Sequence, residues 1–346
     1  MRGNTNKRRG FISIIALIIM SVLMIMILYF ESTTRYEYLI LNSTKNNIQA
    51  YYLSEGKIHM VLNEDKYYKE QLLPMIFKYF RSFPITTPLT YIKISKEDLI
   101  LGDNKSTVKV DMIDNDNRKQ LKLISESDFN GLKSTTTSYL NIVNELFDLE
   151  IPVLDRILID DFHGEDLENL LIDIGKNINI NDNRPSTIYG VDLSNFNNII
   201  LEKIDNNIFQ VSSFRENMTE PYVERFTNKS IIMILRHAKE ESVNLLIQNT
   251  NGNKGTISLS GVIYVEGDIT ISSDFEFKGV IIVKNGEIKV DPIIKPKIKG
   301  IMITDNLANH NFIENMDIVY NRENIYKYGT YVPGFLDPNI IIIKGN

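Results

Sequence analysis

The chain is 346 residues long, with a net charge of −6, 43% apolar residues and 24% charged residues. This length supports one large domain or two ordinary ones, with a real hydrophobic core. No sustained basic block follows the first ten residues, which argues against a nucleic-acid partner. The chain has no cysteine, so disulfides and thiolate metal sites are excluded.

Residues 1–10 are polar and basic, and residues 11–30 form an apolar run without a charge. As a helix, this run spans roughly 30 Å, the thickness of a bilayer's hydrocarbon core. A buried core helix would show a polar face, and a secretory signal would have a shorter apolar region followed by small residues. We therefore expect a retained single-pass membrane helix, with a cytoplasmic N-terminus and an exported C-terminal bulk.

The residues at the start of the apolar run indicate how the helix is processed. Gly10 ends the short basic leader, and Phe11 opens the helix. This arrangement resembles the class III signal that prepilin peptidase reads. The resemblance implies cleavage between Gly10 and Phe11, retention of the helix on the mature protein, and N-methylation of Phe11. A glycine before the cut suits a backbone that must lie extended in a narrow active site.

Residues 31–63 are expected to extend the same helix beyond the membrane, because positions 31–62 contain no proline and a single glycine. Four residues at near-helical spacing form one apolar stripe along it: Tyr38, Leu41, Ile48 and Tyr52. Residues 50–56 (AYYLSEG) resemble the A-x-x-A-E-A/G box that closes the N-terminal segment of PilX-like minor pilins. With the leader, the cut site and the helix length, this resemblance covers about the first 60 residues.

The mature chain departs from most major pilins at its fifth position. Major pilins carry glutamate there, where it meets a neighbouring subunit's N-terminal amine, whereas this chain has Ile15. A buried carboxylate is costly unless it is paired, so its absence suggests a subunit without such a partner. PilX-like minor pilins and tip-located minor pseudopilins share this lack. The resemblance therefore implies a minor subunit, in which Ile15, Leu17 and Glu55 take part in helix assembly.

Residues 64–228 carry mixed signals and predict a small α/β region. Helices are expected over 65–80, interrupted or restarted at Pro74, and over 126–148 and 166–174. Strands are expected over 90–94 and 106–113.

Residues 229–346 are β-rich, beginning with strands over 230–235 and 243–248. Apolar strands then recur after Gly261, Gly279 and Gly300, at separations of 18 and 21 residues. Short strands separated by glycine turns at such a period predict a short β-solenoid. The alternative is an ordinary antiparallel meander.

Two acidic segments were considered as metal sites. Residues 160–166 (DDFHGED) place His163 among carboxylates, which suits several divalent ions, but an acidic turn before a helix gives the same string. Residues 111–117 (DMIDNDN) lack the central glycine and terminal glutamate of a calcium loop. No metal site is expected at either.

Asp268 and Glu287 occupy equivalent positions in the near-repeat and would stack about 5 Å apart on a solenoid. Stacked acids act as acid/base pairs in some sugar-cleaving enzymes, but polar residues occupy such turns by default. Arg236 and His237 follow a strand end and are interpreted as a surface pair. The chain has no P-loop, G-x-S-x-G or H-E-x-x-H motif. We therefore expect no catalytic, cofactor-binding or metal-binding residue and no enzymatic activity.

The sequence as a whole predicts an α+β fold: a long transmembrane-to-stalk helix, a mixed α/β head and a C-terminal β-solenoid. The predicted function is that of a minor pilin-like subunit of a type IV pilus or related secretion filament, with a tip or initiating position favoured over that of a major filament subunit. Its expected partners are prepilin peptidase, other pilins or assembly proteins, and membrane lipid. A membrane-anchored adhesin outside any filament is the first alternative, and an anchored carbohydrate-active enzyme is the second.

Overall fold

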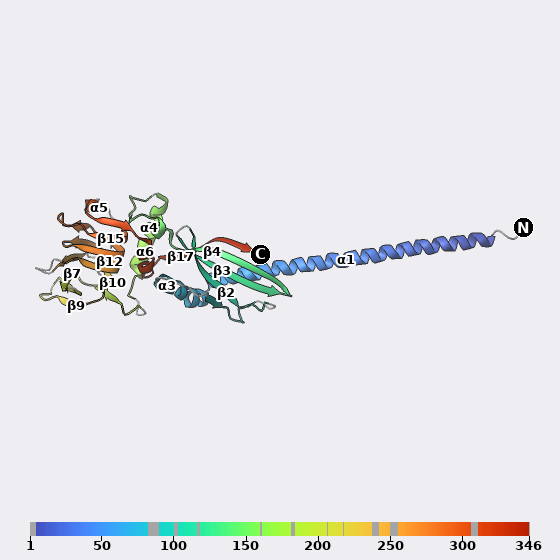
Figure 1. Ribbon diagram of the computed structural model, residues 1–346, viewed down its shortest axis with the longest axis horizontal. Helices are drawn as coiled ribbons and strands as arrows, with labels where there is room; N and C mark the ends of the chain where they lie inside the picture. The colour runs from blue at the N-terminus through green and yellow to red at the C-terminus, as the bar shows by residue number, and fades with distance from the viewer. Residues whose placement is uncertain are drawn as a thin grey trace.

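The computed structural model describes residues 5–81, 90–99, 103–115, 118–159, 161–180, 184–205, 207–216, 218–236, 242–249, 255–305 and 311–345. One long helix projects from a strand-rich head, and the N-terminus lies at the far end of that helix (Figure 1). The chain is therefore a long N-terminal apolar helix joined to a mixed α/β head.

Helix α1 (Thr5–Asn63) is continuous over 59 residues. Polar side chains inside its apolar part bond to the helix itself: the Ser21 hydroxyl donates to the Leu17 carbonyl at 2.8 Å. Helix α2 (Asp65–Tyr67), a π-helical turn η1 (Tyr68–Leu72) and helix α3 (Leu73–Arg81) follow. Pro74 is the second residue of α3, where a missing backbone N–H costs little.

An antiparallel sheet packs against the last turns of α1. Its strand order is β1-β2-β3-β4-β17. The strands are β1 (Thr90–Lys93), β2 (Thr107–Asn115), β3 (Arg118–Phe129), β4 (Leu132–Val143) and β17 (Leu336–Gly345). The last described strand thus completes a sheet whose other strands lie within residues 90–143, and the C-terminus lies beside α1 (Figure 1).

The helix expected over residues 126–148 is wrong. This segment contains the end of β3, all of β4 and a short 3-10 helix η2 (Glu145–Asp148). Asn130 and Gly131 both have positive φ, at 51° and 81°, and form the two-residue turn of a hairpin. The alternation of buried and exposed residues along β4, rich in threonine, is a strand pattern of period two.

A second strand-rich region forms the part of the head farthest from the N-terminus (Figure 1). Its central strands pair in parallel in the order β16-β15-β13-β12-β10-β6, and β12 continues into a second parallel layer with β14, β11 and β7. Hairpin partners β8 and β9 extend that layer, and β5 pairs with β15. The strands are β5 (Val153–Leu154), β6 (Ile188–Asp192), β7 (Asn198–Asp205), β8 (Ile208–Phe214), β9 (Tyr222–Phe226), β10 (Ser230–Leu235), β11 (Val243–Asn249), β12 (Ile257–Ile271), β13 (Phe275–Lys284), β14 (Ile288–Val290), β15 (Lys297–Thr304) and β16 (Asp317–Tyr320). Parallel pairing of β10, β12, β13 and β15 excludes the antiparallel meander for these strands.

The three glycines of the near-repeat lie directly beside one another. Gly261 pairs with Gly279, and Gly279 pairs with Gly300. A Cβ on Gly279 would lie 2.0 Å from the Gly261 carbonyl oxygen, and one on Gly300 would lie 1.8 Å from the Gly279 oxygen. Only glycine allows this approach of neighbouring backbones, so the repeat spacing in the sequence is a packing requirement.

Two apolar cores hold the head together. One lies between the two parallel layers, and the other joins the outer face of the parallel strands to the antiparallel sheet, α1 and the covering helices α4 (Asp161–Asn177) and α6 (Arg322–Gly329). A short helix α5 (Asn311–Asn315) lies near β14 and β16. The second core makes the whole head continuous with the end of α1.

A buried hydrogen bond links α6 to the turn after β4. The Tyr326 hydroxyl donates to Asp148 at 2.6 Å. Burial raises the pKa of the Asp148 carboxyl, and the hydrogen bond from Tyr326 opposes that shift.

Candidate functional site

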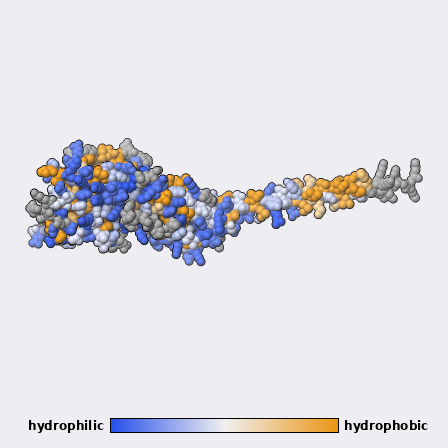
Figure 2. All heavy atoms as spheres, viewed as in Figure 1, coloured by the Kyte–Doolittle hydropathy of each residue, from blue (hydrophilic) through white to orange (hydrophobic). Residues whose placement is uncertain are grey.

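The N-terminal part of α1 is apolar and touches no other described part of the chain. Every side chain from Phe11 to Phe30 is exposed. The most apolar stretch of 18 residues in this helix has a mean hydropathy of 3.1, and none of it is buried. Figure 2 shows this stretch as a hydrophobic surface near the far end of the helix, separated by a section of mixed hydropathy from a head that exposes both hydrophilic and hydrophobic residues. Gly10 and Phe11 lie in the helix, and Ile15 and Leu17 lie on its exposed surface. Length and composition allow this helix to cross a membrane.

The next part of α1, residues 31–45, also lies outside the head, and contact with the head begins at Asn46, whose side-chain oxygen accepts from Asn130 at 3.4 Å. Three of the four residues of the predicted stripe are exposed to solvent: Tyr38, Leu41 and Ile48. Tyr52, the fourth, is 62% exposed although it lies within the packed end of the helix. The stripe therefore runs along the face of α1 that does not contact the sheet.

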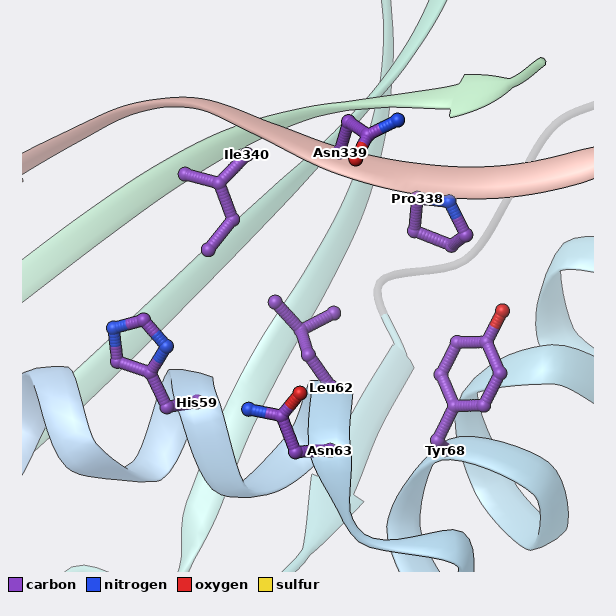
Figure 3. A pocket seen from close by; sticks show the side chains of 7 residues that line it. All are labelled: His59, Leu62, Asn63, Tyr68, Pro338, Asn339 and Ile340. Atoms are coloured by element: carbon purple, nitrogen blue, oxygen red, sulfur yellow. The ribbon is translucent and has the colours of Figure 1, made fainter. Parts of the chain in front are cut away.

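A cavity of about 290 Å³ lies where the end of α1 meets β17. Its walls come from α1, from the turn that follows and from β17: His59, Leu62, Asn63, Tyr68, Pro338, Asn339 and Ile340. Figure 3 shows the α1 side chains pointing toward β17, with the Tyr68 ring at one end and Ile340 facing Leu62 across the gap. Burial raises the pKa of the Tyr68 phenol, and nearby Asp337 raises it further, so the hydroxyl stays neutral.

The box residues lie at the junction of α1 with the antiparallel sheet. The buried positions on this face recur at three- and four-residue spacing: Ala50, Leu53, Ser54, Lys57, Ile58 and Val61. This face packs on β3 and β4. The junction is therefore a helix-on-sheet contact that begins at the first residue of the box.

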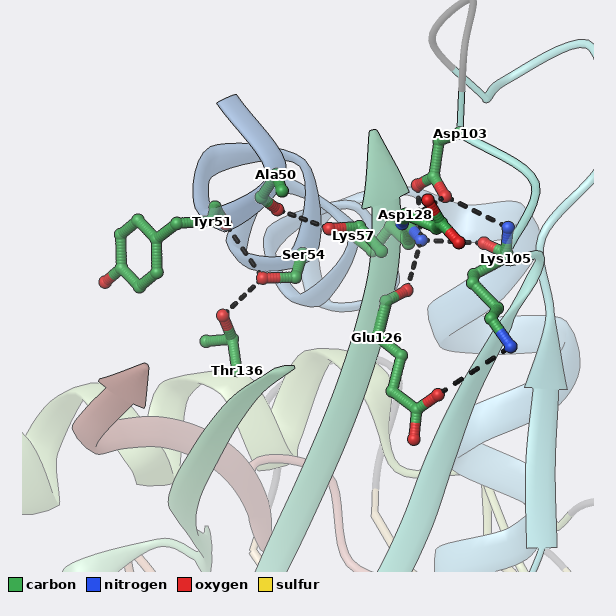
Figure 4. A network of polar contacts seen from close by, with 10 residues as sticks. Ala50, Tyr51, Ser54, Lys57, Asp103, Lys105, Glu126, Asp128 and Thr136 are labelled. Carbon is green, nitrogen blue, oxygen red and sulfur yellow. Dashed lines mark hydrogen bonds and ion pairs between the residues drawn. The ribbon is translucent and has the colours of Figure 1, made fainter. Parts of the chain in front are cut away.

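Lys57 is the centre of a buried polar network at this junction (Figure 4). Its ammonium lies 2.5 Å from the Asp103 carboxylate and donates to the carbonyls of Lys105 at 2.7 Å and Glu126 at 2.6 Å. Asp103 also accepts from the backbone N–H groups of Lys105 at 3.0 Å and Asp128 at 3.3 Å. All three ammonium protons thus have an acceptor, which is the condition under which a buried charge is tolerated.

Two hydroxyl contacts add to the junction on the same face. The Ser127 hydroxyl donates to the Ala50 carbonyl, and the Ser54 and Thr136 hydroxyls share a hydrogen bond. These contacts tie the box to both β3 and β4. Sequence reasoning missed Lys57 and its partners, although a lysine in the middle of an apolar helical face is a recognisable signal of a buried ion pair.

Glu55 points away from this network and is half-buried. No hydrogen bond or ion pair joins its carboxylate to another residue in the described ranges. Gly56 follows it, and a Cβ there would meet nothing within 4 Å. The acidic and glycine positions of the box therefore face outward, and the Ala50 position faces the sheet.

The other candidate sites do not assemble into a centre in the described part of the chain. Among the described residues, no group of three His, Asp or Glu side chains is placed to hold a metal. Of residues 160–166, position 160 lies outside the described ranges, and the others begin α4. Residues 111–115 belong to β2, while positions 116–117 are not described.

Asp268, within β12, and Glu287, just before β14, do lie side by side. The Asp268 carboxylate accepts from the Glu287 backbone N–H at 2.9 Å and from the Lys289 ammonium at 3.2 Å, and Lys289 also lies 3.6 Å from Glu287. Arg236 pairs with Asp192 at 3.3 Å, and His237 is outside the described ranges. These carboxylates therefore have structural partners nearby.

The chain was compared with protein families, curated proteins and solved structures. No protein-family model matches the chain, and no curated protein matches it. Among solved structures, the chain is similar to the competence-associated pilin ComZ from Thermus thermophilus, with 10% sequence identity over 87% of this chain and 98% of that one, at a TM-score of 0.25. A score this low does not establish a shared fold, so the function of this chain is inferred from its own residues and geometry.

Proposed function

We propose that the chain is a minor pilin-like structural subunit of a type IV pilus or a related secretion filament, anchored by α1 and displaying its head outside the membrane. The observation that carries the proposal is α1 itself. It is one unbroken helix whose apolar first part touches nothing in the head and whose last turns are buried in a sheet. Such a helix joins the membrane to the head without a flexible linker.

The length of the exposed helix supports assembly with other helices. Residues 11–49 span about 58 Å at 1.5 Å per residue, roughly twice the thickness of a bilayer's hydrocarbon core. The part beyond the membrane still exposes large apolar side chains, including Tyr38, Leu41 and Ile48. Packing against equivalent helices of other pilins would cover these side chains, with Ile15 and Leu17 among the contacts.

The position of the subunit is proposed from Ile15 and from the shape of the head. Ile15 brings no carboxylate to bind a neighbour's N-terminal amine, which favours a tip or initiating subunit over a shaft subunit. The distal part of the head, with its parallel strands and aligned glycines, is interpreted as a short β-solenoid that would be presented to the surroundings. A structural role rather than catalysis is supported by the pairing of Asp268 and Glu287 with Lys289.

Leader processing tests the proposal directly. We expect prepilin peptidase to cut between Gly10 and Phe11 on the cytoplasmic side, leaving a chain with an N-methylated Phe11 in the membrane. The measurement is the intact mass and N-terminal sequence of the protein from native membranes, with and without the peptidase. Gly10→Val should block processing because a branched side chain would occupy the narrow active site, while Gly3→Val in the same leader should be processed normally.

A peptidase-dependent chain starting at Phe11 supports membership of the pilin machinery. A chain that keeps Met1 in the presence of the peptidase would rule out the pilin assignment and leave a single-pass anchored surface protein.

A further inference from the structure

The two edge strands of the antiparallel sheet, β1 and β17, differ in the hydrogen bonds made by their outer sides. At the β1 edge, the side-chain amide of Gln71 donates to the Lys93 carbonyl at 3.2 Å and accepts from the Lys93 N–H at 3.0 Å. A glutamine amide bound in this way replaces a neighbouring strand. At the opposite edge, no described strand or side chain bonds to the outer side of β17.

The open strand β17 is also unusually apolar for a sheet edge. Residues 340–343 are four isoleucines, of which Ile341 is 51% exposed and Ile342 is 43% exposed. Exposed edges normally carry charges, proline or bulges that discourage pairing. β17 has Pro338 and two register shifts, between Leu336 and Asn339 and between Ile340 and Ile342, so its regular stretch is residues 342–345. A regular edge that begins with two isoleucines is a template for an added strand.

The 290 Å³ cavity lies between the start of this edge and α1, and it is called the groove below. Gly345, at the end of β17, lies against Tyr51, while the start of β17 lines the 290 Å³ cavity with His59 and Leu62. Glu55 lies one helical turn from both Tyr51 and His59 and therefore on the same wall. A cavity of about 150 Å³ already holds a benzene-sized group, so this one has room for a large apolar side chain.

The charges around the groove favour a basic occupant. Three acidic residues lie along it or at its end: Glu55, Glu64 and Asp337. The nearby cation Lys344 lies over the Tyr139 ring, at 5.8 Å from its centre, and Lys57 is buried with Asp103. A strand that alternates apolar and basic residues would place the apolar ones in the cavity and the basic ones beside the carboxylates.

A second copy of this chain does not fit the open edge. The strand β17 runs back along α1 toward its N-terminal end, because Gly345 lies at Tyr51 and Pro338 near Leu62. A two-fold pair of β17 strands would therefore point the two membrane helices in opposite directions, which one membrane does not allow. The remaining edge of a second copy, β1, is occupied by Gln71 at Lys93.

We propose that the groove between β17 and α1 binds an extended segment of a different protein, rich in alternating apolar and basic residues, by adding it as a strand to β17. This inference depends on membrane anchoring through α1 but not on leader cleavage or incorporation into a filament.

The test uses the full chain in lipid nanodiscs and a fluorescent short peptide of alternating lysine and isoleucine. Fluorescence anisotropy should show binding, and hydrogen exchange should show new protection of backbone amides in residues 340–344. The same peptide N-methylated on alternate residues should not bind, because it lacks the backbone donors for pairing. Replacing its lysines with glutamates should weaken binding by about tenfold or more through repulsion from the acidic rim.

Ile342→Lys should also weaken binding by about tenfold or more, because it places a charge on the apolar edge. Ile293→Lys adds the same charge at a residue that is 91% exposed and far from the groove, and it should bind like the unchanged chain. Equal binding of the N-methylated peptide, or no binding of either peptide, would overturn the proposal. The proposal would also be overturned if the chain associates with itself in nanodiscs and Ile342→Lys abolishes that association. A chain that is cut before Phe11 but does not bind the peptide would support the pilin assignment and overturn the proposed strand addition to β17.

Discussion

Lys57 joins α1 to the head through three polar contacts of a single side chain. Its side chain crosses from α1 to β3 and to the segment before β2, and all three of its protons are bonded. The sequence analysis identified the apolar stripe along α1, which is exposed, but did not identify the buried face from Ala50 to Val61. The identity of the partners was beyond sequence reasoning, because Asp103 and Glu126 are brought to Lys57 only by the folding of the sheet.

At this scale we predict that Asp103→Asn destabilises the folded chain by about 3 kcal/mol, because it leaves the Lys57 charge buried without a counter-charge. The double variant Lys57→Met/Asp103→Leu should regain most of that loss, since no charge remains buried. Denaturant unfolding of the detergent-solubilised protein measures both. Asp65→Asn is the matched control, because it removes an exposed partner of Lys69 and should leave stability unchanged. Equal stability of Asp103→Asn and the control would show that the ion pair is unimportant.

At the scale of elements, the sequence was most informative where one physical rule dominated. The glycine spacing identified the strands that follow Gly261, Gly279 and Gly300, because each glycine has to lie against the next backbone. The helix expected over 126–148 is wrong because Asn130 and Gly131 turn the chain into a hairpin between β3 and β4. Strand β17 was not foreseen, since its pairing with β4 joins distant parts of the chain.

The glycine alignment gives a second prediction. Gly279→Ala should destabilise the head by at least about 4 kcal/mol, because its Cβ would lie 2.0 Å from a backbone oxygen that cannot move aside and its φ is 144°. Gly56→Ala is the matched control: it is helical, has open space around it, and should stabilise by about 1 kcal/mol. Thermal unfolding by circular dichroism compares the two. Similar melting of both variants would contradict the role assigned to the aligned glycines.

At the scale of the whole molecule, α1 has an exposed apolar first part and a last part that is buried in the head. Composition alone was enough to recognise residues 11–30 as a stretch able to cross a membrane, and the continuation of the helix followed from the absence of proline. The arrangement of the head was not derivable, because its cores combine residues from α1, both sheets and the C-terminal segment. Only the last turns of α1, from Ala50 onward, contribute to those cores.

This division predicts where the chain can be shortened. A fragment starting at residue 46 should be soluble and fold cooperatively, because it keeps every buried residue of α1. A fragment starting at residue 64 should aggregate or melt at a much lower temperature, because it removes Lys57, Ile58 and Val61 from the core. Solubility and circular dichroism melting of the two fragments provide the measurement. A stable, cooperative fragment from residue 64 would show that the head does not need the helix.

The orientation of α1 along β3 and β4 also has a mechanical consequence. A force that pulls the head away from its anchor acts along the helix axis, so it loads the Lys57 contacts and the apolar face in shear rather than opening them one after another. Rupture then requires all of these contacts to fail nearly together, and resistance to pulling is set by the rate of unfolding rather than by equilibrium stability. The same junction that buries one charged side chain would thus transmit tension from an outer surface to the membrane.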